Sequence, residues 1–185
     1  MNPFENLPPQ SGEELARQKK VLDYLDKLGI QYDYYRHPPA QSMEDCDAFD
    51  RALSISGTHC KNLFLCNRQK TVFYLLVVAG DKPFRTAEMS RQLGVSRLSF
   101  ADAGHLLQYL GCAPGSIGPL GLVCDEGHVV NLLLDEDLRE TETLLLHPNV
   151  NTSSVRMRTG DFFQVFLKAC GHSPRFVHLS NAESM

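Results

Sequence analysis

Residues 62–79, NLFLCNRQKTVFYLLVVA, decide the fold class of this chain. Two runs of apolar, strand-forming residues, 62–66 and 71–79, flank the polar turn 67–70, which is the pattern of a β-hairpin. The longer run is strand-sized and falls well short of the ~18–20 apolar residues that a membrane span needs. We therefore expect a hairpin within a globular domain and no membrane-spanning segment.

Helix and strand patterns interleave irregularly on both sides of this hairpin. Helical spacing or caps predict helices over 11–28, 43–53, 84–93, 103–110 and 159–169. Ser42, with Asp45 at the capping-box position, and Thr159 are the expected N-caps. Further strands are expected at 30–37, 120–124, 128–134, 143–146 and 154–157. The pattern predicts an α/β fold of the mixed α+β kind, an irregular mixed β-sheet surrounded by helices.

The size of the chain favours one domain, since 185 residues lie within the ~100–200 typical of a domain. With 43% hydrophobic and 22% charged residues it can bury a core and keep an ordinary polar surface. Residues 1–10 hold three of the ten prolines and no periodic pattern, so we expect a flexible N-terminal arm followed by a single domain over 11–185. No signal peptide is visible, which favours the cytoplasm.

The charge balance excludes a protein that coats nucleic acid non-specifically. Such proteins are usually basic, whereas this chain has 18 Lys and Arg against 22 Asp and Glu and a net charge of −4. The charge balance leaves open a local basic patch that recognises one particular RNA. Arg17, Lys20 and Lys27 share one face of the first helix, either as a solvated face or as a phosphate-binding patch. A second basic group is Arg85, Arg91 and Arg97.

The six cysteines favour buried free thiols over metal ligands or disulfides. No C-x-x-C motif and no zinc-finger spacing occurs, so we expect no metal. Cys60 follows His59, but neighbouring strand residues point to opposite faces. The sequence therefore gives no support for a thiol enzyme.

Three segments carry candidate chemistry. Lys61 opens an apolar strand, where its ammonium can bind a phosphate or carboxylate or simply remain solvated. The segment 111–119, GCAPGSIGP, combines three glycines and two prolines, so it is a structural loop or a nest. In the nest, free N–H groups of Ser116, Ile117 and Gly118 would bind a carbonyl oxygen or an anion. His147 and Asn151 share a turn between strands, where the imidazole is structural or acts near neutral pH.

Taken together, these segments resemble the YbaK/prolyl-tRNA synthetase-associated domain family, in particular its free-standing members of the PrdX (ProXp-ala) type. The resemblance covers about residues 14–179. It depends on HCKNLFL at 59–65, GSIGP at 115–119 and HPNVNT at 147–152, with GHSP at 171–174 in addition. The order and spacing of the four segments make the match specific. The family fold agrees with the mixed sheet expected above.

The resemblance implies trans-editing, the hydrolysis of an amino acid wrongly esterified to tRNA for proline, with alanine as the expected amino acid. By matching positions, the catalytic residues would be Lys61, Gly115 and His147. The substrate-binding residues would be Ser42, Asn62, Ser116, Ile117, Gly118, Pro119 and Asn151. Ser42 departs from the threonine that is frequent in the family, so substrate choice is left open.

The expected partners are mischarged tRNA for proline and prolyl-tRNA synthetase, without DNA, membrane or cofactor. The expected tRNA contacts are Arg17, Lys20 and Lys27. Two alternatives stay open. One is removal of cysteine or another small amino acid, and the other is a non-catalytic module that senses an amino acid or charged tRNA.

Overall fold

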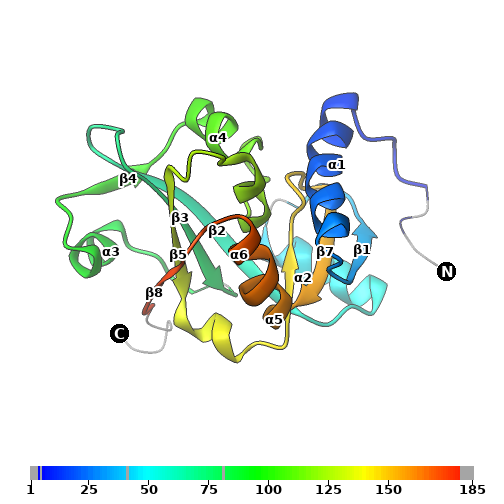
Figure 1. Cartoon of the computed structure of the whole chain (residues 1–185). Helices are drawn as coiled ribbons and strands as arrows, with labels where there is room; N and C mark the ends of the chain where they lie inside the picture. The colour runs from blue at the N-terminus through cyan, green and yellow to red at the C-terminus, as the bar shows by residue number, and fades with distance from the viewer. Residues whose placement is uncertain (1–3, 5, 41, 81, 180–185) are drawn as a thin grey trace.

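A computed structural model describes residues 4, 6–40, 42–80 and 82–179. The strands of this part of the chain form one sheet in the order β1-β7-β6-β2-β3-β5-β8, with β4 paired to β2 (Figure 1). Their bounds are β1 Tyr32–Arg36, β2 Thr58–Asn67, β3 Phe73–Ala79, β4 Leu98–Phe100, β5 Val130–Asp135, β6 Thr143–Leu146, β7 Ser153–Arg158 and β8 Arg175–Val177.

The sheet is mixed, as predicted. The β2–β3 hairpin is antiparallel and pairs Lys61 with Val78, while β5 lies parallel to β3. On the other side, β6 lies parallel to the start of β2, and β7 pairs antiparallel with both β6 and β1. The start of β2 is therefore the junction of two smaller sheets, and Lys61 lies beside that junction.

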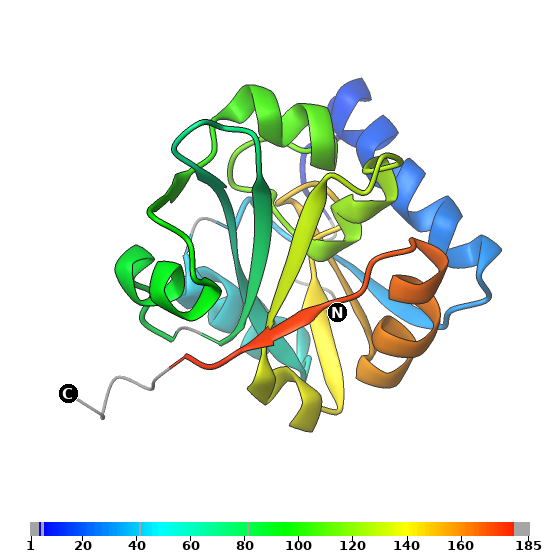
Figure 2. The ribbon, with the colours of Figure 1, turned by 60° about the vertical axis from the view of Figure 1, so that its left-hand side comes forward.

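Helices cover the sheet on both faces, as Figures 1 and 2 show. The α-helices are α1 Gly12–Lys27, α2 Met43–Leu53, α3 Thr86–Leu93 and α4 Ala103–Leu110. Two 3-10 helices follow, η1 Pro119–Cys124 and η2 Glu136–Glu140. The last helical segment joins α5 Thr159–Asp161, the π-helix η3 Phe162–Phe166 and α6 Leu167–Ala169.

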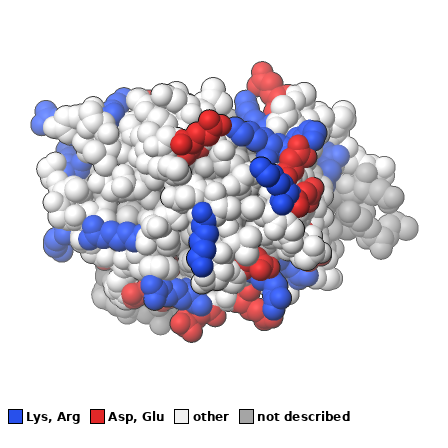
Figure 3. All heavy atoms as spheres, in the orientation of Figure 1, with Lys and Arg blue, Asp and Glu red and all other residues white. Residues whose placement is uncertain are grey.

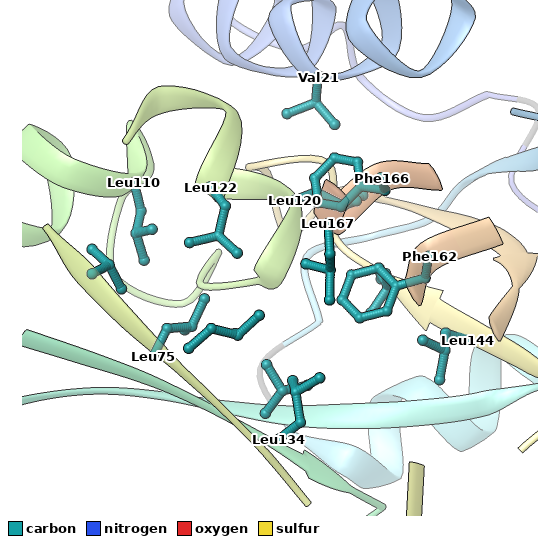
Figure 4. Packing of buried hydrophobic residues seen from close by; sticks show 14 of the residues in the cluster. Val21, Leu75, Leu110, Leu120, Leu122, Leu134, Leu144, Phe162, Phe166 and Leu167 are labelled. Atoms are coloured by element: carbon teal, nitrogen blue, oxygen red, sulfur yellow. The ribbon is translucent and has the colours of Figure 1, made fainter. Parts of the chain in front are cut away.

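The hydrophobic core has two parts because β3 is buried on both faces. Phe73, Leu75 and Val77 belong to the larger cluster, and Leu76 and Val78 to the smaller one. Figure 4 shows the larger cluster, where Val21 of α1, Leu110 of α4 and residues of η1 and of the 162–167 segment meet the sheet. The smaller cluster lies under α3 and includes Met89. A continuous apolar run such as 71–79 is typical of a strand buried on both sides.

The ends of two helices match the predictions residue by residue. Ser42 caps α2, because its hydroxyl accepts from the Asp45 N–H (3.1 Å) and the Asp45 carboxylate accepts from the Ser42 N–H (3.0 Å). Gly111 ends α4 with φ +63°, and a Cβ there would lie 2.6 Å from Cys124 Sγ. A residue without a side chain is thus required where α4 turns into the loop that follows.

Two sequence predictions are wrong in their local structure. Residues 120–124 form the 3-10 helix η1 and not a strand, because Pro119 occupies its first turn. Thr159 is the first residue of its helix and not the N-cap, a position held by Arg158. The Thr159 hydroxyl instead pairs with that of Thr141 (3.1 Å).

The described part of the N-terminal arm lies against the domain. The Pro8 carbonyl accepts from Arg36 (2.7 Å), and the Gln10 side chain donates to Thr152 (2.9 Å). The Phe4 ring meets that of Phe49 edge to face. The domain boundary at residue 10 stays a prediction. Among the helices of the described residues, none is both long and apolar enough to cross a membrane.

Candidate functional site

A cavity of about 500 Å³ lies where α2, β2, β6 and the loop after α4 meet. It brings together six of the predicted site residues, namely Ser42, Lys61, Asn62, Gly115, Ile117 and His147. The other lining residues are Ala40, Met43, Glu44, Cys46, His59, Cys60, Leu145 and Ser154. Residues that are up to about a hundred positions apart in the sequence thus line one cavity, whose walls carry both polar and apolar side chains.

Lys61 reaches the cavity from the first half of β2. Its ammonium donates to the Lys82 carbonyl, in the segment that follows β3. The Lys82 ammonium in turn contacts Asp135 (2.8 Å), whose carboxylate is fully buried and also accepts from the Ala79 N–H (3.2 Å). Through this chain of contacts, the buried Asp135 fixes the backbone that orients Lys61.

His147 lies in the cavity as a neutral imidazole. Its Nδ1 is 3.1 Å from the Ser153 carbonyl oxygen, and a carbonyl only accepts, so Nδ1 carries the proton. Burial is the main cause that lowers the pKa of His147 to about 4, and the nearby His37 and His59 contribute to the same shift. Nε2 is then an unprotonated acceptor at neutral pH, suited to a hydrogen bond with a hydroxyl or a water.

The glycine-rich loop, residues 111–119, has fewer free backbone N–H groups than the sequence predicted. The Ser116 N–H donates to the Ala113 carbonyl (3.0 Å), so the expectation of three free N–H groups is wrong for Ser116. Within the described chain, the N–H groups of Ile117 and Gly118 make no backbone hydrogen bond. Gly118 packs closely, because a Cβ there would lie 3.3 Å from the His147 carbonyl oxygen. The loop and His147 are therefore held together.

The remaining predicted substrate-binding residues lie around the cavity without lining it. Ser116, Gly118 and Pro119 are buried, and Pro119 begins η1. Asn151 is half-buried, and its amide contacts the Ala40 carbonyl at 3.5 Å. A Cβ on Gly115 would lie 3.6 Å from the same amide, so Asn151 supports the loop from behind. Gly115 itself has φ +85°, which favours glycine.

Sequence reasoning missed two polar pairs at the cavity. His59 Nε2 lies 2.8 Å from Asp50 of α2, and His37 Nε2 lies 2.9 Å from the Ser154 hydroxyl. His37 also stacks on Phe49. Asp50 lies nine residues before His59 and Ser154 lies 117 after His37, and no local pattern connects such positions.

Cys60 lines the cavity but is a poor nucleophile. Burial and the nearby Asp135 raise the pKa of the Cys60 thiol to about 12, so it stays protonated at neutral pH. All six cysteines are free thiols, but only Cys46, Cys66 and Cys112 are buried as predicted, and the other three are partly exposed. Among the residues that the structure describes, no cluster of three or more His, Cys, Asp or Glu side chains is arranged to hold a metal ion.

The predicted tRNA-binding residues of α1 do not line the cavity. Arg17 pairs with Glu13 of the same helix (3.0 Å), while Lys20 and Lys27 are exposed. The helix turns Val21 and Leu25 towards the core, so Lys20 and Lys27 point to solvent. Their part in RNA binding stays a prediction.

Comparison with known proteins gives the class of this protein. The sequence model of the aminoacyl-tRNA editing domain matches residues 37–165, which include the cavity and its loop. The chain therefore belongs to the aminoacyl-tRNA editing domain family, and its role is in aminoacyl-tRNA editing.

Particular relatives extend over nearly the whole chain. Mouse prolyl-tRNA synthetase associated domain-containing protein 1 is 32% identical over 168 residues, covering 89% of this chain and 96% of the mouse protein. The prolyl-tRNA editing protein ProX of Acetoanaerobium sticklandii is 27% identical over 90% of this chain and 99% of its own length. A crystal structure of a candidate trans-editing enzyme for prolyl tRNA synthetase has the same fold, with a TM-score of 0.68 and 18% identity over 94% of this chain and 100% of that one.

Proposed function

We propose that this protein is an aminoacyl-tRNA deacylase that hydrolyses the ester of mischarged tRNA for proline, with alanine as the amino acid removed. The observation that carries the proposal is that one cavity brings together a lysine ammonium, a neutral imidazole and the backbone of Gly115 and Ile117 in the glycine-rich loop. The names of the mouse and Acetoanaerobium relatives support a connection with prolyl-tRNA and its synthetase.

The proposed chemistry assigns a role to each group. The Lys61 ammonium binds a phosphate or the sugar of the terminal adenosine, because a compact cation suits an anion or hydroxyl. The free N–H group of Ile117, at the cavity wall, polarises the ester carbonyl and stabilises the oxyanion that forms when water attacks it. The bond from the carbonyl carbon to the ribose oxygen then breaks, and that oxygen takes a proton. The product is the free amino acid and uncharged tRNA.

His147 is proposed to position the reacting groups and not to act as an essential base. Its Nε2 can accept from the attacking water or from the 2′-hydroxyl of the substrate, while Nδ1–H stays bonded to Ser153. Because the pKa of His147 is about 4, the imidazole is a weak base at neutral pH and binds a donor more readily than it takes a proton.

The proposed preference for alanine rests on selection by size. Met43, Ile117 and Leu145 contribute apolar walls to the cavity. A synthetase pocket shaped for proline distinguishes alanine by only ~1–3 kcal/mol per missing methylene, so a second site that admits the smaller amino acid is needed for accuracy. In this proposal, the apolar walls exclude the proline ring and admit alanine.

Substitution of Lys61 tests the assignment. Lys61→Ala should lower kcat/KM for alanyl-tRNA by about 10- to 100-fold, the value of a hydrogen bond to a charged group, ~1.5–3 kcal/mol. Lys168→Ala, at an exposed position of α6 outside the cavity, is the matched control and should leave the rate unchanged. Full activity of Lys61→Ala would contradict the assignment, and tight binding without turnover by the wild type would favour a sensing module.

A further inference from the structure

Phe100 is an exposed aromatic residue at the edge of the sheet. It ends β4 with 60% of its surface exposed, although Leu98, two residues earlier on the same face, is buried at 1%. The Phe84 ring meets the Phe100 ring at 6.3 Å and 66°, an edge-to-face pair. Phe84 packs against the smaller core cluster, so it holds one side of Phe100 in place and leaves the rest of the ring open to solvent.

This aromatic pair is connected to the cavity by strand geometry. Phe100 lies directly opposite Leu65 of β2, and Leu65 and Lys61 share one face of that strand because side chains alternate. Four strand residues span roughly 13 Å, at about 3.3 Å per residue. Phe84 also follows Lys82, whose carbonyl accepts from Lys61. The aromatic pair is therefore close enough to the Lys61 ammonium for a strand of a few nucleotides to contact both.

The surface around Phe100 is basic, although the whole chain is acidic. Arg97 precedes β4, Arg91 lies in the last turn of α3, and Arg68 lies in the β2–β3 turn. Within the described residues these three exposed arginines form no ion pair with the protein. Figure 3 shows Lys and Arg spheres over the side that α3, β4 and the β2–β3 turn occupy in Figure 1, with few acidic spheres between them.

The acidic groups on these elements do not cancel that charge. Asp102, just after β4, pairs with Lys70 (2.7 Å), and Glu88 is half-buried in the first turn of α3. An exposed aromatic ring among unpaired arginines suits a partner that offers flat bases and phosphates together. A purely apolar protein surface would leave the arginine charges without partners.

We propose that Phe100, supported by Phe84, is a stacking platform for the bases of the unpaired 3′ end of the RNA substrate. This proposal rests on the proposed deacylase function, because it places the platform along the path of the strand whose terminal adenosine Lys61 holds. The arginines then neutralise the phosphates that follow. A stacked base contributes ~1–3 kcal/mol with little dependence on sequence, so the platform adds affinity for any tRNA end.

Binding of a short single-stranded RNA with the sequence of a tRNA 3′ end tests the platform directly. Phe100→Ala should weaken binding about 5- to 100-fold, and Phe100→Trp should restore it, because stacking needs only a flat ring. The salt dependence of binding should not change, since no phosphate contact is lost. The control is Leu15→Ala, a similarly exposed apolar residue (49%) on α1, at the opposite side of the molecule in Figure 1.

The activity measurements separate this proposal from the proposed function. Phe100→Ala should lower kcat/KM for alanyl-tRNA by a similar factor, yet leave hydrolysis of alanyl-adenosine, which lacks the preceding bases, unchanged. Equal RNA affinity of Phe100→Ala and wild type would overturn the platform and favour a protein partner for this surface. If wild type hydrolyses neither ester while Phe100→Ala still loses RNA affinity, the deacylase function fails and the platform stands.

Discussion

At the scale of single residues, His147 illustrates how burial and one hydrogen bond set the chemistry of a side chain. The Ser153 carbonyl fixes the proton on Nδ1, and the loss of hydration disfavours the charged form of the ring. The sequence alone indicated a histidine in a turn. It could not indicate the pKa, because the groups around His147 come from β7, the segment after β1 and the glycine-rich loop.

The depressed pKa of His147 predicts a pH-dependent stability. In the folded protein the pKa is about 4, whereas in the unfolded chain it is near the ordinary value of 6.5. Between these values the unfolded state binds more protons, so the free energy of unfolding falls as the pH falls from about 6.5 to 4. Replacing His147 by glutamine, which does not titrate, removes this contribution.

The measurement is urea unfolding of the wild type and of His147→Gln at pH 7 and pH 5. The wild type should lose about 2 kcal/mol more than the variant between the two pH values. His37 and His172, whose pKa values are also lowered by burial, are present in both proteins and cancel in the comparison. An identical pH dependence of the two proteins would contradict the burial of a neutral His147.

At the scale of secondary-structure elements, α2 begins at a cap that also borders the cavity. Ser42→Ala removes the hydroxyl that accepts from the Asp45 N–H and should lower the free energy of unfolding by about 1 kcal/mol. Ser42→Thr keeps a hydroxyl and should cost less than half as much. The measurement is urea unfolding of the wild type and the two variants. An equal decrease in the free energy of unfolding for both variants would show that the hydroxyl of the cap contributes no stability.

The elements differ in how far the sequence predicts them, because their signals are local to different degrees. The N-cap of α2 and the glycine after α4 are local signals, and both helices begin and end as predicted. The apolar run 120–124 has no alternation, so its length and composition fit a strand as well as the buried 3-10 helix that forms. The three-residue strands β4 and β8 are too short to leave a pattern.

At the scale of the whole molecule, the buried Asp135 connects β3, β5 and the segment after β3. Its carboxylate has no exposed surface, and the Lys82 side chain beside it is 10% exposed. Lys82→Met leaves that carboxylate without its cation and should destabilise the protein by ~3–5 kcal/mol. Lys70→Met breaks only the half-exposed pair with Asp102 and should cost ~1 kcal/mol or less. Similar losses for both variants in urea unfolding would disprove the role of Asp135.

The cavity as a whole was only partly predictable from the sequence. Motif resemblance indicated Lys61, Gly115 and His147, which the fold brings to one space. It assigned no role to His59, Asp50, Ser154 or Phe100, because their contacts depend on the packing of α2 against the sheet and on the pairing of β4 with β2. Such contacts join residues that carry no common pattern along the chain.

The most direct test of the central claim is multiple-turnover hydrolysis of alanyl-, cysteinyl-, seryl- and prolyl-tRNA for proline by the wild type and by Lys61→Ala. We expect the wild type to release alanine over many turnovers and to spare the prolyl ester, and we expect Lys61→Ala to release alanine about 10- to 100-fold more slowly. Rapid hydrolysis of the cysteinyl or seryl ester in place of the alanyl ester would show a deacylase with a different amino-acid specificity. Absence of turnover on all four esters would contradict the deacylase function.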